Sequence, residues 1–505
     1  MRTKKFLYNS VTAAILQAFT LLVGLIVPRL YLVTYGSAVN GLVSTIVQFV
    51  SYFNYVEAGL GSVLIYALFK PLATRDTNEI NGIVSVAKKE YIKASGLYFL
   101  LVVCLSLVYP FMINIDSIDV KTVILLVLVI GTFGALDFYT MAKYQVLLIS
   151  DQKEYAISLI SLLALLVNFI VTILLIKNNV YIVLVRLVPM LSFVIRSWLL
   201  HMYVSHRYPF IKYNQPSINL RLTRRWDALI LQISTSINLS VPVVIIAISC
   251  SLKMASVYSV YSMVFAGLIG IISVFTAGVS ASFGNLVAEK EFDLLTRAHT
   301  QFEFSIYGIT AFLYSCTLIL INPFVSIYTS GVRDISYVHP IYGILFVIWG
   351  ILFNVRIPYT ALVNAAGLYR ETRKINLLQV VLLVVLAIIL VQLLGITGVL
   401  LAQIIAMLYW EINLILVIKH LVIEEPLKRT FLRIIRMFIV VGLSNIPFLL
   451  GIQVTASSLY EWFLWAMGVA VWCGIVTLLS NYMFDRKVFI NTAFRLKIMI
   501  PRSIA

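Results

Sequence analysis

The chain has 505 residues, of which 61% are hydrophobic and only 12% are charged, and its formal net charge is +17. An ordinary soluble domain carries about 25% charged residues, so this composition excludes a water-soluble globular protein. Long uncharged apolar runs recur along the chain, and about 20 such residues cross a bilayer core as a helix. The sequence therefore predicts an all-α polytopic membrane protein. A transmembrane barrel is disfavoured because its strands would alternate in polarity.

Fourteen membrane-spanning helices are predicted. The first follows a basic head, but its apolar run is too long for a signal peptide and no small-residue cleavage site follows. The predicted spans are residues 9–33, 39–69, 91–113, 120–148, 155–176, 180–204, 227–250, 254–286, 299–327, 336–364, 374–394, 397–420, 431–450 and 457–483.

Lysine and arginine are distributed unevenly between the loops. The loops on one side hold only Lys121, Lys177, Lys253 and Arg333, whereas the N-terminus, the tail and the loops after even-numbered helices hold most of the 38 basic residues. Positive charge collects on the cytoplasmic side of membrane proteins, so both termini are predicted to be cytoplasmic. The positive charge thus indicates topology, and a nucleic-acid partner is not predicted.

An internal repeat relates the two halves of the chain. FYTMAKYQVLLISDQKEY (138–155) aligns with PYTALVNAAGLYRETRKI (358–375), and YPFMI (109–113) recurs as NPFVSI (322–327). Six helices per repeat give both halves the same orientation. We therefore expect two parallel six-helix lobes, related by a pseudo-twofold axis along the membrane normal, with a substrate cavity between them.

The repeat predicts a division of the chain. It comprises an N-terminal lobe at 1–205, a basic cytoplasmic linker at 206–226, a C-terminal lobe at 227–421, two extra helices at 430–484 and a basic cytoplasmic tail at 485–505. The tail alternates basic and apolar residues, which fits an interfacial helix or a frayed terminus.

Glu57 lies near the middle of the predicted span 39–69, far from any other charge. A charge at the bilayer centre costs about 2.5–3.5 kcal/mol, so such residues usually face a bundle interior or a water-filled cavity. Gly59 and Gly61 weaken the helix there and are predicted to form a hinge. Glu57 is either a protonatable or cation-binding group in a cavity or the partner of an arginine in a packing contact.

Two further acids lie inside predicted spans. Asp137 and Arg356 occupy nearly equivalent repeat positions. They could pair in one state and separate in another, or form a fixed ion pair. Glu411, with Gln403 two turns earlier, is another candidate carboxylate.

Arginine is prominent among the charges at membrane depth. Arg186 and Arg196 flank Pro189, and Arg356 lies two residues before a proline. Arginine forks bind phosphate and pyrophosphate through two hydrogen bonds, which predicts an anionic cargo or lipid head group. Arg29, Arg186 and Lys143 lie close enough to membrane edges to snorkel instead.

Motifs for enzymatic chemistry are missing from the sequence. It contains no P-loop, no HExxH and no nucleophile elbow, and its five histidines and four cysteines are scattered. We therefore predict no catalytic residues, metal or cofactor, and we do not expect an enzyme.

Three stretches carry a family resemblance: PRLYLVTYGSAVNGLVSTIVQF (28–49), EAGLGSVLIYALFKPLA (57–73) and IPYTALVNAAG (357–367). They resemble the Wzx-type polysaccharide repeat-unit flippases of the multidrug/oligosaccharidyl-lipid/polysaccharide (MOP) exporter superfamily, over about residues 5–420. The fourteen helices also resemble the lipid II flippases of that superfamily, so the branch stays open.

The resemblance implies a flippase in the bacterial inner membrane that moves undecaprenyl-pyrophosphate-linked oligosaccharides to the outer leaflet by alternating access. Some members couple transport to H⁺ or Na⁺. Expected partners are the cargo, membrane lipid, and glycosyltransferases or a polymerase of the pathway. The implied substrate-binding residues are Arg186, Arg196, Arg356, Arg29 and Lys143, and the implied ion-coupling or gating residues are Glu57, Asp137 and Glu411.

Two other functions remain open. A cation-coupled multidrug exporter of the same fold should have an acidic, aromatic cavity, whereas here buried arginines match or outnumber acids. A membrane polysaccharide polymerase or ligase should carry a large charged outer loop, which the sequence lacks.

Overall fold

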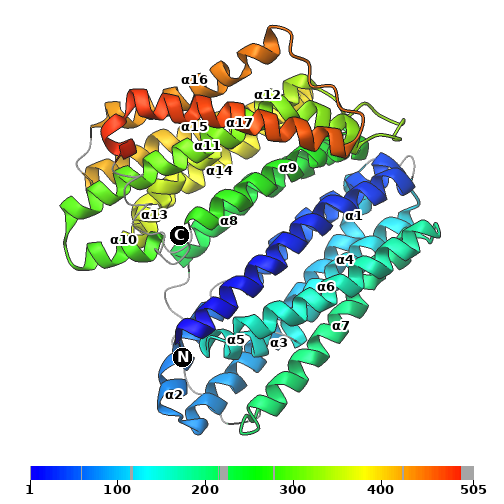
Figure 1. Ribbon diagram of the computed structural model, residues 1–505. Coiled ribbons are helices and arrows are strands. Elements are labelled where there is room, and N and C mark those ends of the chain that lie inside the picture. Colours follow the sequence, from blue (N-terminus) through cyan, green and yellow to red (C-terminus); the bar gives the residue numbers. More distant parts are fainter. Residues whose placement is uncertain are drawn as a thin grey trace. The chain divides into compact units, whose positions relative to one another are not determined.

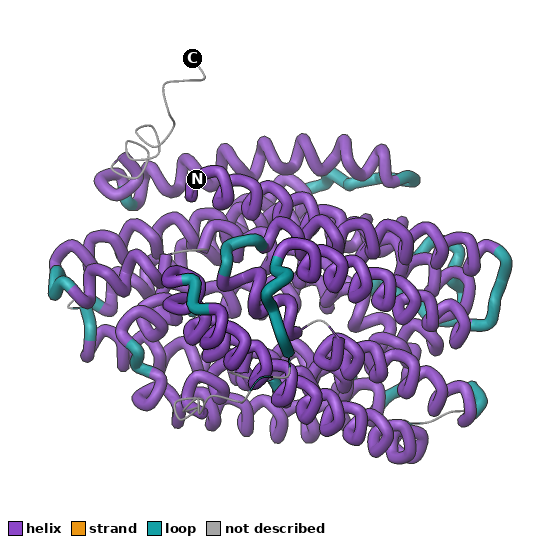
Figure 2. Tube along the Cα trace, turned by 90° about the horizontal axis from the view of Figure 1, so that it is seen from below, coloured by secondary structure: helices purple, strands orange, loops and turns teal. Residues whose placement is uncertain are grey.

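The computed structural model describes residues 2–57, 60–113, 118–140, 142–213, 215, 226–276, 279–423 and 426–490. Within these ranges every regular element is a helix and no strand occurs (Figure 1, Figure 2). The predicted all-α class is confirmed. In a bilayer this follows because a helix satisfies its backbone hydrogen bonds within one segment.

The helices follow one another with short connections. Their bounds are α1 Arg2–Phe53, the 3₁₀ turn η1 Asn54–Val56, α2 Leu60–Thr74, α3 Thr77–Met112, α4 Val120–Thr140, α5 Ala142–Ser150, α6 Glu154–Lys177, α7 Ile182–Arg207, α8 Trp226–Ser249, α9 Leu252–Thr276, α10 Val279–Ala288, α11 Phe292–Tyr328, α12 Pro340–Val355, α13 Ile357–Ala366, α14 Tyr369–Leu394, α15 Ile396–Leu421, α16 Leu427–Leu449 and α17 Leu459–Phe484.

Among the described residues, twelve helices are long and apolar enough to cross a membrane. The prediction of about fourteen spans counted two more. One difference is α1, which runs through the first two predicted spans and bends at Gly36, where φ is 81°. The other is α8, whose apolar part, Ile233–Ser249, is shorter. Each predicted span has a helical counterpart, so the chain is a multi-pass membrane protein.

Four predicted spans are interrupted rather than continuous. η1 interrupts the span 39–69, and Arg356 separates α12 from α13. The other two breaks lie between α4 and α5 and between α9 and α10. At Arg356 the cause is Pro358 in the first turn of α13, since proline lacks an N–H and clashes with the preceding turn.

The internal repeat is visible as helices that match in length and offset. α3 and α11 begin at Thr77 and Phe292, and the 26-residue helices α7 and α15 begin at Ile182 and Ile396, so the two offsets are almost equal.

A steric contact is repeated as well. Tyr98 packs on Gly134, and Tyr314 packs on Gly350 at the corresponding place of the second half, with no room for a Cβ at either glycine. Tyrosine and glycine are displaced by the same offset, and the same knob therefore joins the equivalent helices in each half.

The chain packs as two compact units. Unit 1 comprises residues 1–256 and 332–335, and unit 2 comprises residues 257–331 and 336–505. In unit 1, α1 lies beside α6 and α8. In unit 2, α11 is central and contacts α12, α16 and α17, while α14 packs along α15.

These units follow packing, not the repeat, because α8 belongs to unit 1. The end of that unit is held by Asn40, whose Nδ2 donates to Ser256 Oγ at 2.7 Å. The predicted lobe boundaries and the pseudo-twofold axis stay predictions. Most of the predicted linker (214 and 216–225) and of the tail (491–505) lies outside the described residues.

Replacing Gly350 by alanine should destabilise the protein, because the new Cβ overlaps the Tyr314 ring. Overpacking of this kind costs about 1–3 kcal/mol, so the melting midpoint in detergent should fall. The matched control is Gly442→Ala, whose Cβ meets nothing within 4 Å and should leave the midpoint unchanged or raised. Equal midpoints for the two variants would contradict the tight Tyr314 contact.

Candidate functional site

Glu57 lies where the helix breaks in unit 1. It ends the 3₁₀ turn η1, and the helix resumes at Leu60. The predicted continuous helical face through Glu57 is therefore wrong: the chain unwinds there, as it can where backbone is buried in protein. Tyr91 of α3 donates its hydroxyl to Glu57 Oε1 at 2.8 Å.

Gly61 has a steric role next to this hydrogen bond. A Cβ at Gly61 would lie 3.0 Å from Glu57 Oε1 and 3.2 Å from Tyr91 Oη. Glycine therefore leaves room for the bond in the first turn of α2. Its predicted hinge role stays a prediction, and Gly59 lies outside the described residues.

Asp137 of α4 interacts electrostatically with both Glu57 and Arg196 of α7. Among the described residues, the buried Asp137 Oδ1 and Arg196 Nε make no hydrogen bond, and no direct ion pair joins the two groups. The fold thus gathers three predicted site residues from separate helices. Two carboxylates face one guanidinium there.

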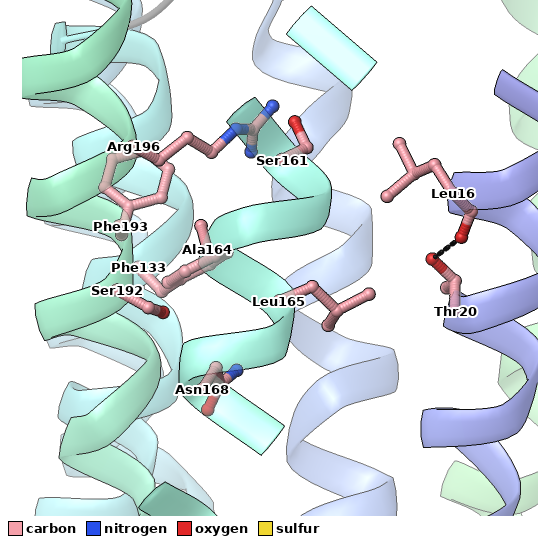
Figure 3. Close-up of a pocket in the computed structure, with 10 residues that line it drawn as sticks. All are labelled: Leu16, Thr20, Phe133, Ser161, Ala164, Leu165, Asn168, Ser192, Phe193 and Arg196. Carbon is pink, nitrogen blue, oxygen red and sulfur yellow. Dashed lines mark hydrogen bonds between the residues drawn. The ribbon is translucent and has the colours of Figure 1, made fainter. Parts of the chain in front are cut away.

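A cavity of about 280 Å³ lies beside Arg196, between α1, α4, α6 and α7 (Figure 3). Its wall is mostly apolar, with Phe133 and Leu165 among the lining residues. The polar groups are Arg196, Ser161, Asn168, Ser192 and Thr20, and Thr20 donates to Leu16 O within α1. Ser161 Oγ is buried without a partner among the described residues.

The other predicted cations of unit 1 lie apart from this group. The Arg186 guanidinium stacks over Tyr31 at 4.3 Å, and its buried Nε makes no hydrogen bond to a described residue. Lys143 Nζ lies 4.9 Å and 5.4 Å from the ring centroids of Tyr144 and Tyr213. Arg29 is partly buried.

Unit 2 contains a second opposite-charge pair. Arg356 lies at the α12–α13 break, and its Nε donates to Phe353 O at 3.0 Å. Its guanidinium covers Phe353 at 4.0 Å and Trp410 at 4.9 Å. Glu411 of α15 is 3% exposed and interacts electrostatically with Arg356. Gln403 lies elsewhere and accepts from Tyr258 Oη at 3.1 Å.

The two pairs occupy related positions with their signs exchanged. Glu411 follows Arg196 at nearly the offset that relates α15 to α7, and Arg356 follows Asp137 at a similar offset. Unit 1 therefore places its arginine on α7, and unit 2 places an acid at the corresponding position of α15. The predicted pairing of Asp137 with Arg356 concerns residues of different units and stays a prediction.

The sequence analysis missed a buried network in unit 2. Arg433 of α16 donates from Nη2 and Nε to Asp485 Oδ2 at 2.6 and 2.9 Å, and its Nη1 lies 3.5 Å from Glu303 of α11. Arg433 and Glu303 are 3% and 0% exposed. The three residues are far apart in the sequence, and the only signal was Arg436, which repeats arginine on one helical face.

A metal site finds no support in the described part of the chain. There, no group of three or more His, Cys, Asp or Glu side chains is placed to hold a metal ion.

Arg433→Met should be strongly destabilising, because it leaves Glu303 and Asp485 buried without their cation. Removing one member of a buried ion pair costs about 3–5 kcal/mol, which a lower melting midpoint in detergent would report. The control, Lys428→Met, changes an exposed residue of the same helix and should have little effect. An Arg433→Met midpoint equal to that of Lys428→Met would show that the network contributes nothing to stability.

Sequence comparisons find no match: no family model and no curated protein matches the chain. Solved structures do. A multidrug resistance MATE family transporter of the MOP superfamily, in an inward-facing conformation, has a TM-score of 0.65 at 13% identity, covering 79% of this chain and 95% of that one.

The lipid II flippase MurJ, in an inward closed conformation, has a TM-score of 0.57 at 16% identity and covers 94% of this chain and 99% of its own. A MOP superfamily transporter from Pyrococcus furiosus, described by the reverse polarity of its binding pocket, has a TM-score of 0.56 at 13% identity, covering 84% and 97%. The chain therefore has the fold of MOP superfamily transporters.

Proposed function

We propose that the chain is a flippase of the Wzx type. It moves undecaprenyl-pyrophosphate-linked oligosaccharide units from the cytoplasmic to the outer leaflet of a bacterial inner membrane by alternating access, with both termini cytoplasmic. Partner enzymes of the same pathway, glycosyltransferases or a polymerase, would supply and consume these units. The fold shared with a lipid flippase and with transporters supports the class.

The observation that carries the anionic cargo is the state of the interior arginines. Arg186 and Arg196 bury Nε atoms without hydrogen-bond partners among the described residues, which leaves donors for an anion. Arg196 also lines the cavity of unit 1. Phosphate and pyrophosphate oxygens match the guanidinium fork and can accept two parallel bonds.

The carboxylates provide candidate coupling groups. Glu57 and Asp137 in unit 1, and Glu411 in unit 2, are acids inside a membrane protein, and such residues commonly serve proton or ion pathways. We assign H⁺ or Na⁺ coupling to this set. Arg29 and Lys143 are assigned to the approach of the anionic head group.

A multidrug exporter is the second candidate. It is favoured by the MATE transporter match with a TM-score of 0.65 and by the paired acids Glu57 and Asp137, which would suit an organic cation. The two functions make opposite demands on Arg196 and Arg356, because an interior arginine repels a cationic drug.

Flipping in proteoliposomes tests the choice. With fluorescent undecaprenyl-pyrophosphate-oligosaccharide, wild-type protein should expose the lipid on the opposite leaflet, and Arg356→Ala should slow this at least about tenfold. A lost charge-assisted hydrogen bond is worth about 1.5–3 kcal/mol, and about 1.4 kcal/mol is a factor of ten. The control, Arg333→Gln, alters an exposed loop residue and should flip normally.

Glu57→Gln should flip without responding to an imposed H⁺ or Na⁺ gradient, because the amide cannot exchange a proton or bind a cation by charge. A gradient response equal to wild type would remove Glu57 from the coupling role. Export of organic cations by wild-type protein, together with no flipping of several pyrophosphate-linked lipids, would overturn the flippase and favour the drug exporter.

A further inference from the structure

We propose that the cavity beside Arg196 binds the phosphate-bearing head group of an anionic lipid, and that this head group displaces Asp137 from Arg196, so that the Asp137–Glu57 pair takes up a proton from the aqueous phase. The inference rests on the proposed function for the class of cargo. It adds a specific site, a competitor for the cargo and a proton linked to binding.

The cavity has the chemistry of a head-group site. At about 280 Å³ it is close to the lower end of the roughly 300–1,000 Å³ of small-molecule sites, enough for a head group but not for a whole lipid. Ser161 adds a hydroxyl without a partner among the described residues. Phe133 and Leu165 add apolar wall for the first atoms of a hydrocarbon chain.

Arg196 is held loosely by its own protein. Asp137 is its electrostatic partner, but no direct ion pair forms between them in the described structure. An anion in the cavity can form the close bonds that Asp137 does not. Arg356 differs, because its Nε already donates to Phe353 O and its guanidinium lies over Phe353 and Trp410.

The proton follows from the groups around Asp137. These are Arg196 from α7, Glu57 after η1, and the hydroxyls of Tyr91 and Tyr98 from α3. When the anion engages Arg196, two carboxylates face each other without a free cation. Like charges that share a site of low dielectric do not both stay ionised, so one carboxylate oxygen binds a proton.

The test is calorimetric titration of the full chain in detergent with farnesyl diphosphoryl-N-acetylglucosamine. The probe is a pyrophosphate diester without a titration near neutral pH, so any proton counted belongs to the protein. Titration in two buffers of different ionisation enthalpy gives the proton count. Wild type should take up about one proton per ligand, and Glu289→Gln, an exposed control, should do the same.

The variants should separate the two carboxyl groups from the arginine. Asp137→Asn should bind the probe more tightly than wild type because the competitor is gone, and the double variant Glu57→Gln/Asp137→Asn should bind it with almost no proton uptake. Arg196→Gln should weaken binding at least tenfold, while Arg196→Lys should retain part of it. The neutral pair Arg196→Met/Asp137→Asn removes both charges together and checks that weak binding is not misfolding.

Three results would overturn the inference while leaving the flippase intact. They are probe binding unchanged in Arg196→Gln, proton uptake unchanged in the double carboxyl variant, and inorganic pyrophosphate bound as tightly as the lipid probe. No probe binding by wild type, with binding of a cationic amphiphile instead, would overturn the proposed function itself.

Discussion

A charge or an unsatisfied polar group in hydrocarbon surroundings is costly, and this constraint shapes the whole molecule. It makes every described regular element a helix, because only a helix or a closed barrel satisfies the backbone inside a bilayer. It also limits where ionisable residues can lie. Glu57, Asp137 and Arg196 meet within unit 1, and Arg356 and Glu411 meet within unit 2.

The two units solve this constraint with the same geometry and opposite signs. An acid and an arginine on corresponding helices are neutral together in either arrangement, so packing and the Tyr–Gly contacts of the repeat can be retained while the charges exchange. What changes is the binding capacity. Unit 1 offers an arginine beside a cavity, whereas the arginine of unit 2 is hydrogen-bonded and covered by two aromatic rings.

The two helices outside the repeat are integrated by charge as well as by apolar packing. Arg433 connects α16 to α11 and to Asp485 beyond α17, and Trp462 of α17 donates to Leu320 O of α11 at 3.2 Å. Because α11 also contacts α12, which ends at Arg356, these helices are part of the structure that holds the second charge pair.

The sequence by itself determined the membrane class, the helical spans and the repeat, because hydropathy and charge asymmetry are properties of local segments. It also identified the interior charges, since an ionised residue in an apolar run is visible without a fold. Only the tertiary structure decided the partners. Tyr91 for Glu57, Arg196 for Asp137 and Asp485 for Arg433 come from distant segments, and no spacing in the sequence specifies which side chains packing brings together. The break at Glu57 was missed for the same reason: whether a glycine-containing segment bends depends on the neighbours that satisfy its backbone and fill the space beside it.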